Sequence, residues 1–229
     1  VLCALTYEGA APIVLTGANR PASAAGADGP ANLVDAVAVA GSSRAAGFGV
    51  CLCFGGELHA AMTVRKVDST GPAALGSPTA GPFGRVVEGR LWLHARPLSP
   101  PTIVPRDLRH RVEIVTASLG DDGAAMSHAA HHADGVVLVA FGAGHLSPAL
   151  VRELRAAPAP VLVTNRPERS SMLFDTYGFE GAERDVRGSG AVCVPFLSAP
   201  AARIALLCCL GAGFDTPAIA EALRSYDAT

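Results

Sequence analysis

"PIVLTGANRP" (residues 12–21), followed closely by "ADGPANLVDA" (27–36), is the stretch that decides the fold. The apolar start predicts a buried strand, and the polar middle predicts a loop. Asp28-Gly-Pro30 predicts the capped first turn of a helix, with proline near the first helical position. The chain changes from apolar to polar between Leu15 and Arg20, where the strand ends. Open α/β sheets place ligand sites at the carboxyl ends of their strands, so this loop is a candidate ligand site.

Apolar spacing after Pro30 predicts a helix that ends near Gly41. The i, i+3, i+4, i+7 rhythm predicts that one face is buried; it consists of Leu33, Ala36, Val37 and Ala40. Short apolar runs and helical patterns then alternate, which is typical of parallel sheets with crossover helices. The expected strands are 13–16, 48–54, 62–66, 90–94, 112–118, 135–141, 160–164 and 191–195. Further helices are expected at 124–133, from Ser147-Pro148, at 199–210 and at 217–225.

A proline-rich segment, Arg96-Pro-Leu-Ser-Pro-Pro-Thr-Ile-Val-Pro105, interrupts this alternation. Four prolines in ten residues exclude a helix or a central strand. We therefore expect an α/β chain with an N-terminal domain over 1–95, a linker over 96–111 and a C-terminal domain over 112–229. The N-terminal α/β domain is expected to be the larger and to be incomplete at its front. The smaller C-terminal α/β domain is expected to contain a parallel sheet.

Composition narrows the functional class. Half of the 229 residues are hydrophobic and 17% are charged, which excludes a disordered chain. A net charge of −2 and a pI near 6.4 argue against nucleic acid as a partner. No apolar run has the length of a membrane span, so we expect no membrane partner. The six cysteines lack zinc-site spacing and lie in apolar segments, which favours buried free thiols in a reducing, cytoplasmic compartment. An exported protein is the alternative that the sequence leaves open.

Other chemical motifs are weak. His128, His131 and His132 lie near Asp134, but no further ligands follow at fixed spacing, so a solvated helix surface is expected and no metal site. A serine-hydrolase elbow and phosphate-binding glycine loops are absent from the sequence. We therefore expect no cofactor.

The segment "VLTGANRPASAAGADGPANLVDA" (14–36) resembles the type I/II bacterial L-asparaginase family, in which a TGAxRP…ADGPxNLxDA block recurs. The resemblance continues in order along the whole chain. It includes Thr63-Val-Arg-Lys66, Gly81-Pro-Phe-Gly84, "DGVVLVAFGAGH" (134–145) and "PVLVTNR" (160–166).

This resemblance implies an amidohydrolase that converts L-asparagine and water to L-aspartate and ammonia through an acyl-threonine intermediate. It implies a small-molecule amino-acid amide as substrate and a homo-oligomer, a dimer of dimers. In the family, a threonine in a TGGTI-like loop is the nucleophile, and a Thr–Asp pair in an HGTDT-like motif works with a distant lysine. An alcohol needs such a neighbour to accept its proton. Lys66, the only lysine in the chain, matches that catalytic lysine.

The resemblance also suggests residues that bind substrate. Asp28 and Asn32 lie near the expected strand ends, with helix capping and loop hydrogen bonding as their alternative roles. His145 stands where many members have an asparagine that reaches a neighbouring subunit's site. Ser171 stands where the family often has a glutamate that contacts the substrate's amino group.

Neither a TGGTI-like nor an HGTDT-like motif occurs in the 229 residues. The match begins at Val1 within the helix that follows the second motif, so we expect a chain that lacks its front. The alternative is a catalytically inactive asparaginase-like protein that binds a small ligand or is a remnant.

Overall fold

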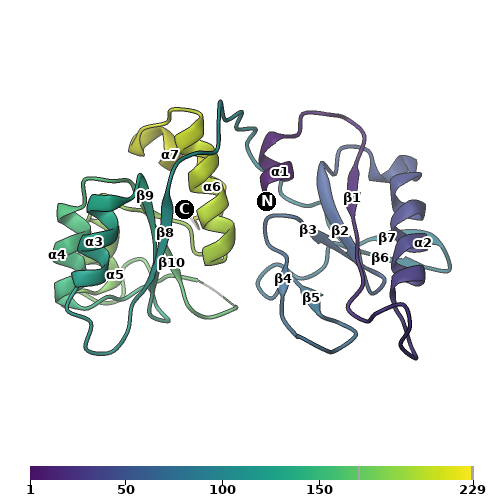
Figure 1. The fold of residues 1–229 in the computed structure, drawn as a ribbon, viewed down its shortest axis with the longest axis horizontal. Coiled ribbons are helices and arrows are strands. Elements are labelled where there is room, and N and C mark those ends of the chain that lie inside the picture. The colour runs from purple at the N-terminus through teal and green to yellow at the C-terminus, as the bar shows by residue number, and fades with distance from the viewer. Residues whose placement is uncertain (170, 228–229) are drawn as a thin grey trace. The chain divides into compact units, whose positions relative to one another are not determined.

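The computed structural model describes residues 1–169 and 171–227 (Figure 1). The chain forms two compact units, one made of Val1 and Cys3–Thr102 and the other of Leu2 and Ile103–Thr229. Within this chain the second unit is the longer. The backbone from 94 to 111, which includes the proline-rich segment, has neither helix nor strand.

A mixed sheet forms the centre of the first unit. Its strand order is β1-β2-β3-β6-β7, with bounds β1 Ile13–Leu15, β2 Val50–Phe54, β3 Glu57–Ala60, β6 Gly84–Val87 and β7 Arg90–Leu93. β1 and β2 are parallel, and the remaining pairs are antiparallel. The other elements of this unit are α1 Leu2–Thr6, α2 Gly29–Ala40, the 3-10 turn Ser43–Ala45 and a small ladder of β4 Arg65–Lys66 with β5 Leu75–Gly76.

Two hairpin turns explain the strands that sequence analysis missed. Gly55 and Gly56 join β2 to β3, and both have positive φ. Glu88 and Gly89, also at positive φ, join β6 to β7. Two-residue loops of this kind match the twist of the flanking strands, so they support tight antiparallel pairing. The strand expected over 62–66 is wrong for most of its length, because residues 61–63 form a turn after β3 and only Arg65–Lys66 pair with β5.

The buried face of α2 also differs from the prediction. Its buried residues are Asn32, Ala36 and Val39, whereas Leu33 and Val37 are 58% and 64% exposed. Almost every position of this helix is small or apolar, so its periodicity did not distinguish one face from the other. The hydrogen bonds of the Asn32 side chain decide the orientation, because they require that side to face the strand ends.

The second unit contains the expected parallel sheet. Its strand order is β11-β10-β9-β8, with bounds β8 Val112–Thr116, β9 Gly135–Ala140, β10 Val161–Asn165 and β11 Val192–Cys193. Helices cover both of its faces, with α3, α4 and α5 on one side and α6 and α7 on the other (Figure 1). Their bounds are α3 Ala124–His132, α4 Pro148–Ala156, α5 Glu183–Arg187, α6 Ala199–Gly211 and α7 Thr216–Leu223, followed by the 3-10 turn Arg224–Tyr226. None of the helices in the described part of the chain has the length and apolar character needed to cross a membrane.

Side-chain caps mark the starts of α4 and α7 in this unit. Ser147 accepts a hydrogen bond from the Leu150 N–H at 3.1 Å, with Pro148 in the first helical turn. Asp215 accepts one from the Ala218 N–H at 3.0 Å at the start of α7. These caps satisfy N–H groups that have no partner within the helix, so the predicted starts of α4 and α7 are confirmed to within a residue or two.

The cysteines are all free thiols. Cys3 is exposed, which corrects the expectation that all six are buried, because it lies on the outer side of the short α1. The other five are buried, and burial raises the pKa of Cys51 and of Cys209 to about 12. Thiols held in the protonated form in this way are poor nucleophiles, so these cysteines fill the two cores.

Candidate functional site

Lys66 in the first unit lies at the end of β4 and points its ammonium group at the loop that follows β1. Its Nζ donates a hydrogen bond to Asn19 Oδ1 at 2.8 Å. The Asn19 amide in turn donates from Nδ2 to the Gly71 carbonyl oxygen at 2.9 Å. Lys66 is therefore fixed by a loop 47 residues earlier in the chain, and Asn19 connects two segments that the sequence gives no reason to pair.

Asp28 holds that loop in place. Its carboxylate accepts hydrogen bonds from the backbone N–H of Asn19, at 2.9 and 3.1 Å to the two oxygens, and from the Arg20 N–H at 2.9 Å. The Asn19 and Arg20 N–H groups hold the pKa of Asp28 below its usual range. Although Asp28 occupies the cap position of α2, its side chain accepts no capping hydrogen bond from a backbone N–H of the helix. The alternative of loop hydrogen bonding therefore describes it better than helix capping.

Asn32 lies beneath the same loop and is 3% exposed. Its Oδ1 accepts from the Gly55 N–H at 2.9 Å, and its Nδ2 donates to the Gly17 carbonyl at 2.9 Å and to Asp28 Oδ2 at 3.3 Å. One side chain thus joins α2, the loop after β1 and the turn between β2 and β3. Because its amide oxygen and its amide nitrogen both form hydrogen bonds within the protein, Asn32 stabilises the loop after β1.

The turn after Lys66 closes on Asp68. This carboxylate accepts from the Thr70 and Gly71 N–H groups, both at 2.8 Å, and these bonds hold the pKa of Asp68 below its usual range. Lys66, Val67, Asp68 and Ser69 line an open hollow of about 450 Å³. The hollow is therefore bordered by an ammonium group and a carboxylate, which can bind the polar ends of a small substrate.

Replacing Asn32 with alanine is expected to lower the free energy of unfolding by about 2 kcal/mol, because the hydrogen bonds of this buried side chain to Gly17, Gly55 and Asp28 are all lost. Urea unfolding followed by circular dichroism measures this change. Val37→Ala is the matched control on the same helix, since the Val37 side chain is exposed, and its effect is expected to stay within about 0.5 kcal/mol. Equal losses in the two variants would contradict the assigned orientation of α2.

His145 in the second unit lies in the loop that follows β9. Its Nε2 is 3.0 Å from Glu183 Oε2, and its ring lies edge-on to Tyr177 and Phe179, with centroids 5.3 and 5.1 Å away. A carboxylate only accepts hydrogen bonds, so Nε2 carries the proton of this contact. In the neutral ring, Nδ1 is then the acceptor.

Glu183 begins α5 and is fully buried. Its Oε1 accepts hydrogen bonds from the Thr176 and Tyr177 N–H groups, both at 2.6 Å. Burial by itself raises the pKa of Glu183, but the hydrogen bonds from these N–H groups and from His145 lower it by more. The pKa of Glu183 therefore lies below its usual value. Sequence reasoning missed this charged, buried residue and also missed Asn19. An acidic residue in the first turn of a helix was the available signal for Glu183.

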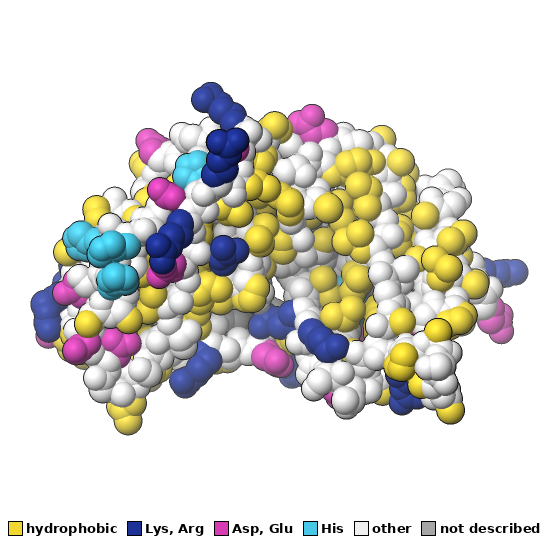
Figure 2. Space-filling view, viewed as in Figure 1, with side chains coloured by type: hydrophobic (Ala, Val, Ile, Leu, Met, Phe, Trp, Pro, Cys, Tyr) yellow, Lys and Arg dark blue, Asp and Glu magenta, His cyan; other side chains and the backbone are white. Residues whose placement is uncertain are grey.

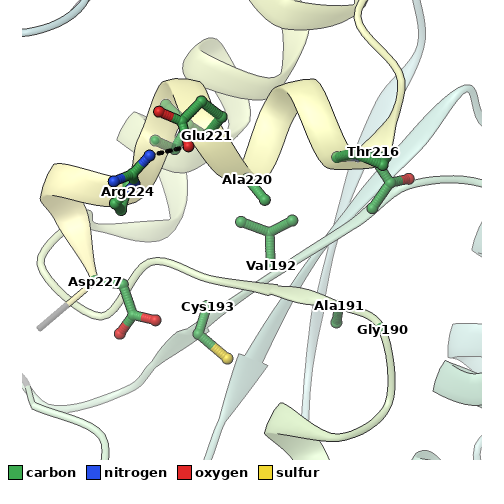
Figure 3. A pocket seen from close by; sticks show the side chains of 11 residues that line it. Gly190, Ala191, Val192, Cys193, Thr216, Ala220, Glu221, Arg224 and Asp227 are labelled. Carbon is green, nitrogen blue, oxygen red and sulfur yellow. Dashed lines mark hydrogen bonds and ion pairs between the residues drawn. The ribbon is translucent and has the colours of Figure 1, made fainter. Parts of the chain in front are cut away.

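Two other features lie outside these sites. A hollow of about 510 Å³ lies in the second unit between β11 and α7 (Figure 3). Val192 and Ala220 project into it, and Glu221 and Arg224 form an ion pair beside it, but none of the candidate catalytic or substrate-binding residues lines it. Within the described residues, no group of three or more His, Cys, Asp or Glu side chains is placed to hold a metal ion.

Two compact α/β units, one with a polar site around a lysine and one with a parallel sheet, define a two-domain α/β protein. The family described as "Asparaginase, N-terminal" matches residues 1–99, and the "Glutaminase/Asparaginase C-terminal domain" matches residues 111–223. The chain belongs to the asparaginase family.

Curated relatives support this assignment. A probable L-asparaginase of Deinococcus radiodurans is 37% identical over 206 residues, which cover 88% of this chain and 63% of the relative. A probable periplasmic L-asparaginase of Haemophilus influenzae is 29% identical over 97% of this chain and 65% of the relative. A glutaminase-asparaginase of Pseudomonas fluorescens biotype A is 33% identical over 66% of this chain and 36% of the relative. The chain thus spans less than two thirds of the length of each of these relatives.

Proposed function

We propose that the protein is an L-asparaginase-type amidohydrolase, which converts L-asparagine and water to L-aspartate and ammonia. The observation that carries this proposal is the Lys66 ammonium, held 2.8 Å from Asn19 in a loop that Asp28 fixes. The names of the relatives, L-asparaginase and glutaminase-asparaginase, support the same class of reaction.

Lys66 is the proposed catalytic lysine of a proton relay. An ammonium group near a Thr–Asp pair stabilises the anionic partner and so helps the threonine hydroxyl to lose its proton when it attacks the amide carbon. The amide C–N bond breaks and ammonia leaves as the acyl-threonine ester forms, and water then hydrolyses the ester to L-aspartate and the free threonine hydroxyl. The nucleophilic threonine and the Thr–Asp motif do not occur in the 229 residues, so this mechanism requires them from outside this sequence.

His145 is proposed to contact the substrate. Glu183 orients its ring by accepting from Nε2 at 3.0 Å, which leaves Nδ1 to accept a hydrogen bond from a substrate N–H group. The proposed assembly is a homo-oligomer, a dimer of dimers, in which this loop serves a neighbouring protomer's site. Asp28 and Asn32 stay in the proposal as residues that shape the loop beside Lys66.

The alternative is an asparaginase-like protein that binds an amino-acid amide without hydrolysing it. The absence of both threonine motifs from the 229 residues favours this alternative for the chain taken by itself. It retains the polar hollow at Lys66 and requires no nucleophile.

The test is ammonia release from L-asparagine by the longest natural polypeptide that contains these residues, with the 229-residue chain measured beside it. The proposal predicts release by the longer polypeptide and none by the chain alone. Calorimetry with L-asparagine distinguishes the alternative, which predicts binding by both polypeptides without ammonia. Release by the 229-residue chain alone would overturn the assignment of the nucleophile to residues outside it.

A further inference from the structure

Three histidines lie on the surface of α3 in the second unit. His128, His131 and His132 are all exposed, and histidine side chains gather on the face of the molecule over this helix (Figure 2). Sequence analysis predicted a solvated surface here because no third or fourth ligand follows at fixed spacing. The structure adds the geometry of the rings.

The rings of His128 and His132 lie together. Their centroids are 4.2 Å apart and their planes are inclined by 21°. Residues four apart share one face of a helix, so both imidazoles stand over the same turn. A metal ion bound at 2.0–2.1 Å by two imidazole nitrogens needs those nitrogens roughly 3 Å apart. Binding therefore requires the exposed His128 side chain to rotate out of the stack, while His132 keeps its place.

The hydrogen bond of His132 selects its tautomer. His132 Nδ1 lies 2.9 Å from the His128 carbonyl oxygen. A carbonyl oxygen only accepts, so Nδ1 of the neutral ring carries the hydrogen and Nε2 carries the lone pair. Histidines that bind metals commonly donate their other ring N–H to a backbone carbonyl in this way, which fixes the ring orientation. His131 makes the equivalent bond to the Ser127 carbonyl at 2.8 Å, but no ring contact joins it to the other two histidines.

The position on the helix also favours a cation. α3 ends at His132, so the pair spans its last turns. The final carbonyl groups of a helix carry partial negative charge, and a positive charge near them is stabilised.

We propose that His128 and His132 form a two-histidine chelate for a divalent transition metal, with Cu²⁺, Ni²⁺ and Zn²⁺ as the ions that imidazole nitrogen prefers. Both ligand atoms are Nε2, and water completes the coordination sphere. Hard cations such as Mg²⁺ prefer oxygen ligands and are excluded from this site. The site lies in the second unit and does not depend on the proposed asparaginase activity.

The test is titration of Ni²⁺ and Cu²⁺ into the untagged chain by calorimetry, in a Cys3→Ser background that removes the exposed thiol. We expect one strong site, tighter for Cu²⁺ than for Ni²⁺. Because the second ligand binds intramolecularly, His128→Gln and His132→Gln are each expected to weaken binding by about tenfold or more. His131→Gln is the matched control, since it removes a histidine with the same backbone hydrogen bond, and its affinity is expected to stay within about threefold.

Three results would overturn the proposal: unchanged affinity in His128→Gln and His132→Gln, an equal loss in His131→Gln, or comparable binding of Mg²⁺. All three positions are exposed, so thermal melts of the metal-free variants should coincide with that of the parent chain. The losses of affinity can then be assigned to ligation.

Discussion

Replacing Lys66 with alanine is expected to lower kcat for L-asparagine hydrolysis by about 10²–10⁴-fold, the range typical of a lost proton-transfer group. The longest natural polypeptide that contains this chain is the protein to measure, with ammonia release as the readout. The physical reason is charge: alanine removes the ammonium group that Asn19 holds at 2.8 Å, and the relay loses the cation that stabilises its anionic partner.

Lys66→Arg tests whether any cation suffices. Arginine keeps the charge, but its larger planar group does not fit a compact relay, so we expect little recovery of kcat. Arg90→Ala, at an exposed position of β7 in the same unit, is the control and should retain full activity. Full activity in Lys66→Ala would remove Lys66 from the mechanism, whereas a rise in KM at unchanged kcat would make it a binding residue only.

The α/β class and the parallel sheet of the second unit could be predicted from the sequence because their signals are local. A short apolar run such as β9, buried at every position, can pack only within a sheet covered on both faces. Ser147-Pro148 marks a helix start because the Ser147 side chain caps the N–H of Leu150, three residues later. Such patterns involve only neighbouring residues, so a single sequence is enough to recognise them.

The antiparallel part of the first sheet could not be predicted in the same way. β3 is Glu-Leu-His-Ala, a sequence that has no strong strand preference, and its pairing with β2 depends on the backbone conformation of Gly55-Gly56. The buried face of α2 was also beyond prediction, because Leu33 and Val37 are as apolar as the residues that face the core. Its orientation follows from hydrogen bonds of Asn32 to residues 15 and 23 positions away.

The residues of the candidate site also differ in whether a local sequence pattern could identify them. Lys66 stood out because it is the only lysine and lies within a run of family-like residues, whereas Asn19 gains its role only from a contact 47 residues away. Glu183 likewise meets His145 across 38 residues. Polar contacts between residues this far apart in the sequence are formed by the tertiary fold, so local sequence patterns do not indicate them.

Glu183→Ala is expected to destabilise the second unit by about 3–5 kcal/mol, because three hydrogen bonds to a buried carboxylate are lost. The substitution leaves the Thr176 and Tyr177 N–H groups without an acceptor and His145 without its partner. Urea unfolding followed by circular dichroism measures the loss. Glu180→Ala is the control, because Glu180 is 61% exposed and its pairing with Arg152 at 3.6 Å is worth less than about 1 kcal/mol.

Glu183→Gln isolates the charge from the shape. The amide oxygen still accepts from the two N–H groups, so we expect a smaller loss than in Glu183→Ala. Because the pKa of Glu183 is lowered in the folded state, its ionised form contributes stability above its ordinary pKa of 4.5, and that contribution is lost as the pH falls through the lowered value. The advantage of the parent chain over Glu183→Gln should therefore be constant near neutral pH and shrink in acid. An advantage that grows as the pH falls would show that the carboxyl is protonated in the native state, and His145 would then face a neutral acid instead of the acceptor that orients it.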